Sequence, residues 1–470
     1  MKSTCRPERI DERFIRRIAL ATLAGTSIEW YDFFLYGTAA ALIFPTVFFP
    51  ADMPAAVALL ASFSTFAVGF VARPLGGIVF GHFGDRVGRK KALVIALIMM
   101  GLATTLIGCL PSYASVGVAA PVLLIVLRFV QGIAIGGQWG GAVLIATESA
   151  PPARRGFYGS FAQVGAPAGV ILANLAFLVV TANTSQQAFM HWGWRLPFLF
   201  SITLIAVALF VQLGLEDTAA FLKLRQTGQG RESQLEAHAG KSDRRRSPVL
   251  EALRTHPKQI ALVAGASLAV QVPFYILIAF VIAYGTGAMG PHVSRTTMLA
   301  GVLVGAVVMV PSLLIAAVWS DRYGRRGIYM AGAALLAAWS FAVFPLLDTG
   351  SFLWICVSIG VAQVFVAMMY GPQAAFVSEM FSTDVRYSGA SLGYQLGAIL
   401  GGAFAPIIAT ALLTKYHSTV GISIYMAIAC AITMVSIWLL QETAGSNMEK
   451  HIIAGRADGV PLQSTRAQYP

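Results

Sequence analysis

The sequence is poor in charge and in cysteine. Only 11% of its 470 residues are charged, whereas 57% are hydrophobic. A soluble globular protein is usually about 25% charged and about 45–50% apolar, so the composition argues against a soluble protein and excludes a disordered one. The four cysteines, at positions 5, 109, 356 and 430, have no metal-ligand spacing such as C-x-x-C. They are expected to be small packing residues.

Signatures of common enzymes are also missing. The sequence has no Walker A loop, no H-E-x-x-H and no G-x-S-x-G, and its seven histidines lie in loops, tails or helix ends. Residues 285–290 match G-x-G-x-x-G, but no strand precedes them, so they are not expected to bind a dinucleotide. We therefore predict that the protein is not an enzyme and holds no metal.

Long apolar runs are what the sequence has in abundance. A helix that crosses about 30 Å of hydrocarbon needs roughly 20 apolar residues, and in lipid the backbone must satisfy its own hydrogen bonds. These rules predict an all-α membrane protein with twelve transmembrane helices. The predicted spans are 18–49, 56–82, 91–110, 120–145, 157–181, 195–215, 259–284, 297–319, 328–347, 352–376, 387–412 and 420–440.

Basic residues set the predicted orientation. If the N-terminus is cytoplasmic, the inner segments hold 28 Lys and Arg side chains and the outer segments only Arg195, Arg295 and Lys415. Basic residues are enriched in cytoplasmic loops, so both termini are predicted to be cytoplasmic. The net charge of +12 then follows from membrane topology, and no nucleic-acid partner is expected.

A polar segment separates the spans into two halves. Residues 217–258 include GQGRESQ and KSDRRRSP, which are typical of a tether near anionic head groups. The predicted organisation is a cytoplasmic N-tail (1–17), a six-helix half (18–216), a cytoplasmic linker (217–258), a second six-helix half (259–441) and a cytoplasmic C-tail (442–470).

The two halves repeat each other. DRVGR at 85–89 recurs as DRYGR at 321–325, and a Glu…Arg…Gln…Gly pattern at 148–165 recurs at 379–397. Such repeats are typical of transporters whose substrate site lies between the halves near the midplane. Charged groups at helix ends can bridge to neighbouring helix termini, so these loops are predicted to gate the cytoplasmic side; a pure topology signal is the alternative. The predicted gating residues are Gly81, Asp85, Arg86, Gly88, Arg89, Glu148, Asp321, Arg322, Gly324, Arg325, Glu379 and Arg386.

The paired loops, the R-x-x-x-G that begins at Arg128 and the twelve spans resemble the major facilitator superfamily. IEWYDFFLYG at 28–37, RPLGG at 73–77 and WGWRLPF at 192–198 resemble, more narrowly, the metabolite:H⁺ symporter family. Its members carry citrate, 2-oxoglutarate, shikimate, dicarboxylates or proline/betaine. The resemblance implies a symporter in the plasma membrane, the inner membrane of a bacterium. Glu29, where shikimate carriers have Asp, and Ala317, which matches Gly81, depart from the pattern.

Four ionisable side chains lie deep in the predicted spans of the first half: Glu29, Asp32, Arg73 and Arg128. A charge at a helix centre costs roughly 2.5–3.5 kcal/mol, so each is predicted to be functional. At 1.5 Å per residue, the estimated depths match Glu29 with Arg73 and Asp32 with Arg128. Exchanged partners and a purely structural role for Arg73 remain open.

Glu29 and Asp32 are three residues apart, on a helix face that also carries Tyr36. Two carboxylates so close in a low dielectric should not both stay ionised, and we expect them to titrate as a unit. The hypothesis is that ionised Asp32 holds Arg128 and that protonation releases Arg128 to a substrate carboxylate. The proton is then the coupling ion and no other cofactor is expected; the alternative is a static ion pair.

Polar residues along the other spans could line a substrate cavity or join helices to one another. The predicted substrate-binding residues are Arg128, Tyr36, Arg73, Gln131, Gln138, Trp139, Gln163, Asn174, Gln271, Tyr275, Gln363 and Tyr370.

Together these features predict a monomeric, proton-coupled symporter that imports a small organic acid, shikimate-like or a mono- or dicarboxylate, by alternating access. Uptake of a zwitterionic osmolyte such as proline or betaine, and export or antiport by the same fold, remain open. The repeated gating loops argue against a channel, and the lack of a sizeable soluble domain argues against a sensor.

Overall fold

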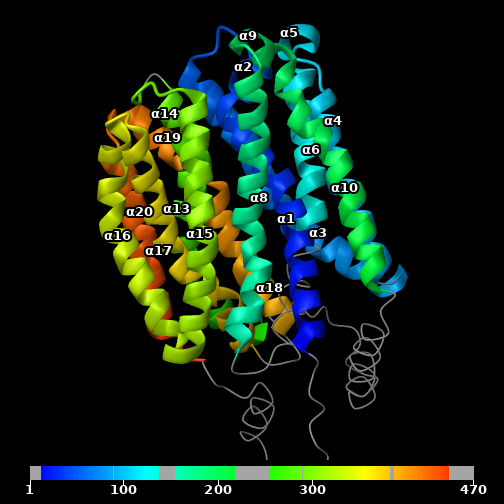
Figure 1. Ribbon diagram of the computed structural model, residues 1–470, viewed down its shortest axis with the longest axis vertical. Coiled ribbons are helices and arrows are strands. Elements are labelled where there is room, and N and C mark those ends of the chain that lie inside the picture. Colours follow the sequence, from blue (N-terminus) through cyan, green and yellow to red (C-terminus); the bar gives the residue numbers. More distant parts are fainter. Residues whose placement is uncertain are drawn as a thin grey trace, which may run out of the picture.

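The computed structural model describes residues 12–87, 89–136, 154–216, 254–287, 289–381 and 386–443, and these are almost entirely helical, with no strand among them. The long helices run side by side along the long axis of the molecule (Figure 1). The sequence prediction of an all-α protein is thus confirmed for the described part of the chain.

The described residues of the first half form six long helices with short helical turns between them. Its elements are α1 (Glu12–Leu42), α2 (Phe44–Val47), α3 (Ala55–Val87), α4 (Arg89–Cys109), α5 (Tyr113–Val116), α6 (Ala119–Gly136), α8 (Arg155–Asn183), α9 (Gln186–Ala188), the π-helical turn η2 (Phe189–Gly193) and α10 (Arg195–Glu216).

The second half has the same number of long rods, two of which contain a π-helical turn. Its elements are α13 (Pro257–Tyr275), η3 (Ile276–Phe280), α14 (Val281–Thr286), α15 (Arg295–Tyr323), α16 (Arg325–Asp348), α17 (Phe352–Glu379), α18 (Arg386–Gly397), η4 (Ala398–Ala403), α19 (Ala405–Tyr416) and α20 (Val420–Leu439).

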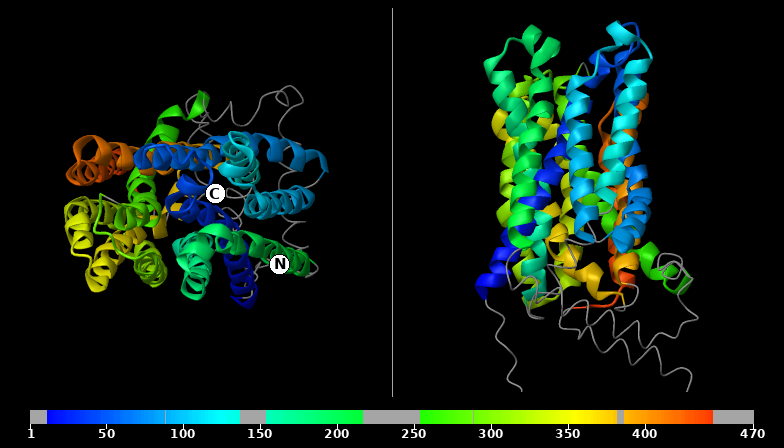
Figure 2. Two further views of the ribbon diagram at one scale, coloured as in Figure 1. Left: turned by 90° about the horizontal axis from the view of Figure 1, so that it is seen from above. Right: turned by 90° about the vertical axis from the view of Figure 1, so that its right-hand side faces the viewer.

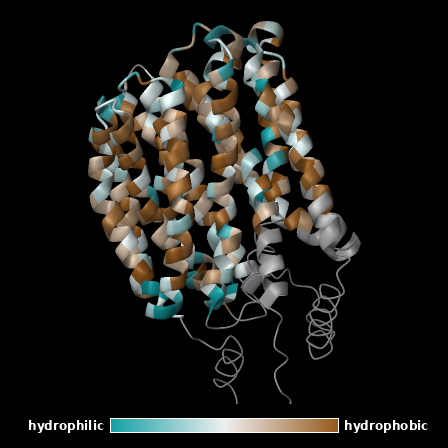
Figure 3. Ribbon diagram, viewed as in Figure 1, coloured by the Kyte–Doolittle hydropathy of each residue, from teal (hydrophilic) through white to brown (hydrophobic). Residues whose placement is uncertain are grey.

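Among the described residues, nine helical rods are long and apolar enough to cross a membrane, and two shorter apolar helices lie within α4 and α10. With α1, which carries Glu29 and Asp32, they make the twelve predicted spans. Large apolar side chains such as Ile78 and Trp438 point outward. Hydrophobic residues cover the flanks of the bundle and hydrophilic residues gather towards its two ends (Figure 3). This surface suits a lipid environment.

The two groups of helices lie side by side when the bundle is viewed along its axis (Figure 2). The halves meet where α8 packs against α15 and α17, where α3 packs against η4 and α19, and where α1 packs against η3 and α14. The rod from α13 to α14 lies in the middle, and 94% of its most apolar window is buried. A site between the halves is therefore bordered by α1, α3, α8, α13 and α18.

Glycines bring α3 and α6 unusually close together. A Cβ atom on Gly132 would overlap the carbonyl oxygen of Gly69, and one on Gly136 would overlap the carbonyl oxygen of Arg73. Small residues of this kind let helix backbones approach in a membrane. The close approach also holds two arginines, Arg73 of α3 and Arg128 of α6, in the same layer of the first half.

Candidate functional site

Two buried arginines share one aromatic ring at the centre of the first half. The Cζ atom of Arg128 lies 4.3 Å from the ring centroid of Phe33, and that of Arg73 lies 4.4 Å from the same centroid. Both side chains are at most 2% exposed. Aromatic faces attract cations, so Phe33 helps to keep two guanidinium groups charged in an apolar layer.

Further rings complete the surroundings of each arginine. Arg128 lies 4.2 Å from the ring centroid of Tyr36 and 4.7 Å from that of Phe66, and Arg73 lies 4.5 Å from that of Phe70. Tyr36 in turn donates a hydrogen bond from its hydroxyl to Thr65 Oγ1 over 2.7 Å. Tyr36 is thus placed beside Arg128.

Several guanidinium N–H groups have no acceptor. Arg128 Nη1 donates to Gln131 Oε1 over 3.0 Å, and Nε makes a long contact of 3.5 Å to the Phe66 carbonyl. Arg128 Nη2, and both Nε and Nη2 of Arg73, have no hydrogen-bond partner among the described residues. Buried polar groups are normally paired, so these donors are available to an anion that enters the site.

Asp32 points away from the arginines, towards α4 and α10. Its Oδ1 accepts a hydrogen bond of 2.6 Å from Ser201 Oγ, and the Thr104 hydroxyl is its other hydrogen-bond partner. The predicted direct contact with Arg128 is not what the structure shows. The pairing was predicted from estimated depth along the helix axis, and depth does not fix the direction in which a side chain points.

Glu29 lies near Arg73. The positive charge of Arg73 acts on the Glu29 carboxylate, and this carboxylate also interacts electrostatically with Tyr394 of α18. The pairing suggested by matching depths therefore brings Glu29 to the boundary between the halves.

The second half faces the arginines with tyrosines. The Tyr275 ring lies 5.1 Å from that of Phe70 and 6.3 Å from that of Phe33, centroid to centroid, and its hydroxyl is a hydrogen-bond partner of Arg73. Tyr394 bonds to Gln271 and to Tyr370. Gln271, Tyr275 and Tyr370 were predicted substrate-binding residues, and the structure brings all three to one side of Arg73.

Two amides of α8 lie at the same boundary. Gln163 Nε2 lies 3.5 Å from the carbonyl oxygen of Tyr370, and Gln163 Oε1 has no partner among the described residues. Asn174 Nδ2 donates to the Val170 carbonyl over 3.0 Å, which leaves Asn174 Oδ1 without one. The Oε1 of Gln363, in α17, is also unpartnered within the described chain.

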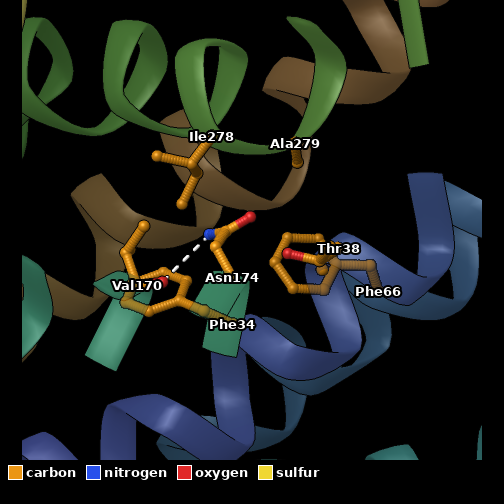
Figure 4. Close-up of a pocket in the computed structure, with 8 residues that line it drawn as sticks. Phe34, Thr38, Phe66, Val170, Asn174, Ile278 and Ala279 are labelled. Carbon is orange, nitrogen blue, oxygen red and sulfur yellow. Dashed lines mark hydrogen bonds between the residues drawn. The ribbon is translucent and has the colours of Figure 1, made fainter. Parts of the chain in front are cut away.

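Asn174 borders a small hollow between the halves. In Figure 4 its side-chain oxygen points towards the backbone segment that carries Ile278 and Ala279. Apart from Asn174 and Thr38 the side chains of the wall are apolar, and they include Phe66, one of the rings around Arg128. The lining residues are Phe34, Gly37, Thr38, Phe66, Val170, Asn174, Ile278 and Ala279.

A charged contact joins the halves at the end of the bundle shown lowest in Figure 1, called here the Asp321 end. The backbone N–H groups of Gly156 and Phe157, at the start of α8, donate to the two carboxylate oxygens of Asp321 over 2.9 Å each. Asp321 belongs to α15, in the other half. A carboxylate at a helix N-terminus is stabilised by the free N–H groups and by the helix dipole, so this contact closes the two halves here.

Arg325 supports the closing carboxylate. Its Nη1 lies 3.3 Å from Asp321 Oδ1, while Nε and Nη2 donate to the two carboxylate oxygens of Glu379 over 2.7 and 2.8 Å. Two parallel bonds of this type fix geometry as well as adding energy. The structure thus joins three predicted gating residues in one buried cluster.

The remaining predicted gating residues differ in placement. Gly324 has a φ of 95°, which favours glycine, and the Glu442 carboxylate lies beside it and accepts hydrogen bonds from the backbone N–H groups of Arg325 and Arg326. Arg322 is exposed. The described residues do not include Gly88, Gln138, Trp139 and Glu148, and side-chain surroundings are not described for Gly81, Asp85, Arg86, Arg89 and Arg386.

Sequence reasoning missed several residues of the site. Ser201 and Thr104 are ordinary hydroxyl residues in apolar helices, and no sequence pattern distinguishes them from residues that bond to their own helix. Phe33 lies within the recognised 28–37 segment, but its contact with two arginines depends on how α3 and α6 pack. Tyr394 is adjacent to Gln395 on α18, and a search for all polar residues on that helix would have found it.

Known proteins resemble this chain along nearly its whole length. The family model described as "Sugar (and other) transporter" matches residues 18–452. The "Shikimate transporter" of Escherichia coli (strain K12) is 41% identical over 435 residues, which cover 91% of this chain and 95% of that protein. The "Inner membrane metabolite transport protein YhjE" of the same organism is 40% identical over 433 residues, 91% of this chain and 94% of that protein.

More distant similarity extends to another substrate class and to solved structures. The "Proline/betaine transporter" of Salmonella typhimurium is 30% identical over 439 residues, which cover 93% of this chain and 85% of that protein. A partially occluded, inward-open structure of the xylose transporter XylE from E. coli superimposes with a TM-score of 0.70, at 19% identity, over 93% of this chain and all of that one. The fold of the described helices is therefore that of a known transporter.

Proposed function

The chain belongs to the sugar (and other) transporter family of the major facilitator superfamily, and from that premise we propose that it is a proton-coupled symporter that imports a small organic acid. The family and the relatives are multi-pass membrane transporters, not enzymes. The protein accordingly moves a small-molecule substrate across a membrane. Substrate, coupling ion and direction are the proposed part.

The observation that carries the proposal is the pair of buried arginines with unfilled N–H groups. Arg73 and Arg128 together offer three guanidinium nitrogens that have no acceptor among the described residues. A guanidinium matches a carboxylate with two parallel hydrogen bonds, and the surrounding rings exclude water. Tyr275, Tyr370 and Gln271 provide hydroxyl and amide groups that suit a hydroxylated acid, in keeping with the named substrate of the shikimate transporter relative.

The proton site in this proposal is Asp32, with Glu29 as a second candidate. Both are buried carboxyl groups in the first span, and ionisable side chains within a span are typical of proton pathways. The proton is the only coupling ion in the proposal, and no further cofactor takes part. Protonation of this carboxyl group and binding of the substrate come first. The two halves then rock and expose the site on the other side of the membrane.

The Asp321 end is assigned to the cytoplasm in this proposal. Its loops carry most of the Lys and Arg residues, and such loops stay inside. YhjE, one of the similar relatives, is named as an inner membrane protein, which supports the same membrane for this chain. The proposal also places both termini in the cytoplasm and takes the monomer as the transporting unit.

Uptake by purified protein in liposomes tests the proposal. Radiolabelled shikimate is supplied outside at a pH one unit below the interior, with the membrane potential clamped at zero. One proton per monoanion predicts accumulation up to about tenfold, and collapse of the pH gradient should abolish it. Uptake that does not change with the pH gradient would show that proton coupling is wrong. Accumulation only when the pH gradient is reversed would indicate antiport or export.

A zwitterionic osmolyte is the second candidate substrate. The proline/betaine transporter relative supports it, and the rings of Trp30 and Phe34, which stack with centroids 5.1 Å apart, offer a surface for a cationic group. A zwitterion that enters with a proton carries net charge, whereas a monoanion with a proton does not. Proline or betaine uptake driven by an interior-negative potential of 100 mV, worth about 2.3 kcal/mol per charge, would select this alternative.

A further inference from the structure

Two side chains connect Asp32 with Arg128. Arg128 Nη1 donates to Gln131 Oε1 over 3.0 Å, and Gln131 Nε2 donates to the Thr104 hydroxyl over 2.7 Å. Thr104 is in turn a hydrogen-bond partner of the Asp32 carboxylate. None of these four side chains is more than 1% exposed. The cation and the acid do not touch, yet two hydrogen bonds and the interaction of Thr104 with Asp32 join them from α6 through α4 to α1.

The hydroxyl of Thr104 has a choice of acceptors. Its oxygen already accepts from Gln131, so its single proton can go either to the carbonyl oxygen of Met100, at 2.9 Å, or to Asp32. An ionised carboxylate is the stronger acceptor. With Asp32 ionised, every donor in the chain therefore points from Arg128 towards Asp32. With Asp32 protonated, the Thr104 proton turns to Met100.

We infer that Gln131 and Thr104 form a coupling relay through which the charge on Asp32 determines how firmly Arg128 is held away from the substrate. The inference rests on the proposed function. Hydrogen bonds in a chain polarise one another, so a negative charge at one end strengthens the bond that the positive end makes with Gln131. Loss of that charge weakens the bond, and Arg128 Nη1 becomes available together with Nη2, which is unpartnered within the described chain.

The proton balance of the relay is simple. The proton that neutralises Asp32 comes from the aqueous side to which the site is open, and Thr104 keeps its own proton and only changes acceptor. A substrate carboxylate then binds the two Nη atoms of Arg128 in a fork. Gln131 and Thr104 are positioning residues, because they act on the substrate only through Arg128.

Ser201, on α10, belongs to the surroundings of Asp32 but not to the relay. Its hydroxyl donates to Asp32 Oδ1 and has no other hydrogen-bond partner among the described residues. Other groups that carry or can take a charge also lie on the elements packed round Asp32, and they must be kept unchanged in any test of pH dependence. The described ones are Glu29, Tyr31 and Tyr36 on α1, Arg73 on α3, Arg128 on α6, Tyr158 and Arg155 on α8, Arg195 on α10, and Tyr284 on α14.

The variant that tests the relay is Thr104→Val, which keeps the shape of the side chain and removes the hydroxyl. Shikimate binding to the purified full-length protein is measured by calorimetry between pH 5.5 and 8.5. We expect the affinity of the wild type for shikimate to rise as the pH falls. In Thr104→Val the ratio of the affinities at pH 5.5 and pH 8.5 should be smaller by about tenfold or more, as for loss of a hydrogen bond to a charged group. Thr104→Ser should restore it.

Thr105→Val is the matched control. Thr105 is the next residue of α4, and its hydroxyl donates only to the Gly101 carbonyl of its own helix, over 2.9 Å, so the variant should behave as wild type. In an Asp32→Asn background the Thr104 substitution should have no further effect on affinity for the substrate. The negative charge of Asp32, which acts on Arg128 through the relay, is already absent in that background. A purely structural role of Thr104 would give additive losses instead.

The outcomes separate the relay from the proposed function. If wild-type binding depends on pH and Thr104→Val keeps the full dependence, the relay is wrong and the symporter proposal stands. If wild-type binding does not depend on pH, proton coupling fails and the relay fails with it. Gln131→Met removes the hydrogen bonds that Gln131 makes in the same relay. This variant is used in place of Thr104→Val if Thr104→Val does not fold. A substrate-free readout, the pH dependence of the unfolding temperature, applies the same comparison if shikimate does not bind.

Discussion

Arg73 and Arg128 hold their guanidinium carbons 4.4 and 4.3 Å from the centroid of the same ring, that of Phe33. The charges of two buried arginines so close to one ring act on each other, and contact with the aromatic ring offsets that repulsion only in part, by roughly 0.5–2 kcal/mol for each cation. An anion between or beside them would remove it. The arginine pair is therefore more favourable with a bound carboxylate than without one.

Lysine substitutions test this arrangement. Arg128→Lys keeps the charge but removes the planar fork that matches a carboxylate, so we expect carboxylate binding to weaken at least about tenfold, measured by calorimetry. Arg195→Lys is the control, because the Arg195 guanidinium donates to the Gly108 carbonyl over 3.0 Å, away from the arginine pair. Unchanged binding by Arg128→Lys would mean that the substrate acid is held elsewhere.

Neutralising the two acids should separate accumulation from exchange. Asp32→Asn mimics a permanently protonated carboxyl, so the site can still bind substrate and cross the membrane, but no proton gradient can drive it. We expect counterflow in liposomes to persist and uphill uptake to disappear. Glu29→Gln serves as the comparison, and if it alone abolishes uphill uptake, the coupling proton belongs to Glu29.

The sequence predicted the twelve spans because length and hydropathy depend on the membrane and hardly on tertiary contacts. It could not predict the breaks within them. The π-helical turns η3 and η4 lie inside continuous apolar stretches, at 276–280 and 398–403, and follow from how the halves pack round the middle of the bundle. Pro273, just before η3, was a local hint only.

The candidate site was predictable in its composition and not in its connections. Buried charges are rare enough in a membrane span that each one signals function, and the structure buries all four. Which groups touch depends on the direction of each side chain round its helix. Ser201 and Thr104 therefore replaced Arg128 as the partners of Asp32. The repeat pattern could have indicated that Asp321 contacts the start of α8. It could not show that the Asp321 carboxylate accepts hydrogen bonds from two backbone N–H groups there.

Asp321 should control how readily the bundle opens at its own end. Asp321→Asn removes the negative charge that two α8 N–H groups and Arg325 share, at a cost of about 1 kcal/mol, which favours separation of the halves there. With Ser160→Cys, a buried position in α8, as reporter in a background without native cysteines, we expect maleimide labelling to accelerate about fivefold.

The exposed neighbour provides the control for that experiment. Arg322→Gln changes the charge of the next residue of α15 without touching the buried cluster of Asp321, Arg325 and Glu379, so labelling should stay at the wild-type rate. Equal acceleration by both variants would show that the net charge at the end of α15, rather than the contact with α8, governs opening.

Glycine at the crossing of α3 and α6 should be indispensable for the arginine pair. A Cβ atom at Gly132 would overlap the Gly69 carbonyl oxygen and crowd Ala72, and backbone atoms cannot move aside as a flexible side chain can. Such overpacking typically costs about 1–3 kcal/mol. Gly132→Ala is therefore expected to lower the unfolding temperature in detergent and to weaken substrate binding, because Arg128 lies one turn away on the same helix.

A second glycine distinguishes crowding from a general effect of alanine. Gly25, in α1, has no atom within 4 Å of the position that a Cβ would take, and alanine is favoured over glycine in a helix by roughly 0.5–1 kcal/mol. Gly25→Ala should thus be neutral or stabilising and should leave binding unchanged. If Gly132→Ala were equally harmless, α3 and α6 would not be held by their close approach, and the position of Arg128 against Phe33 would need another cause.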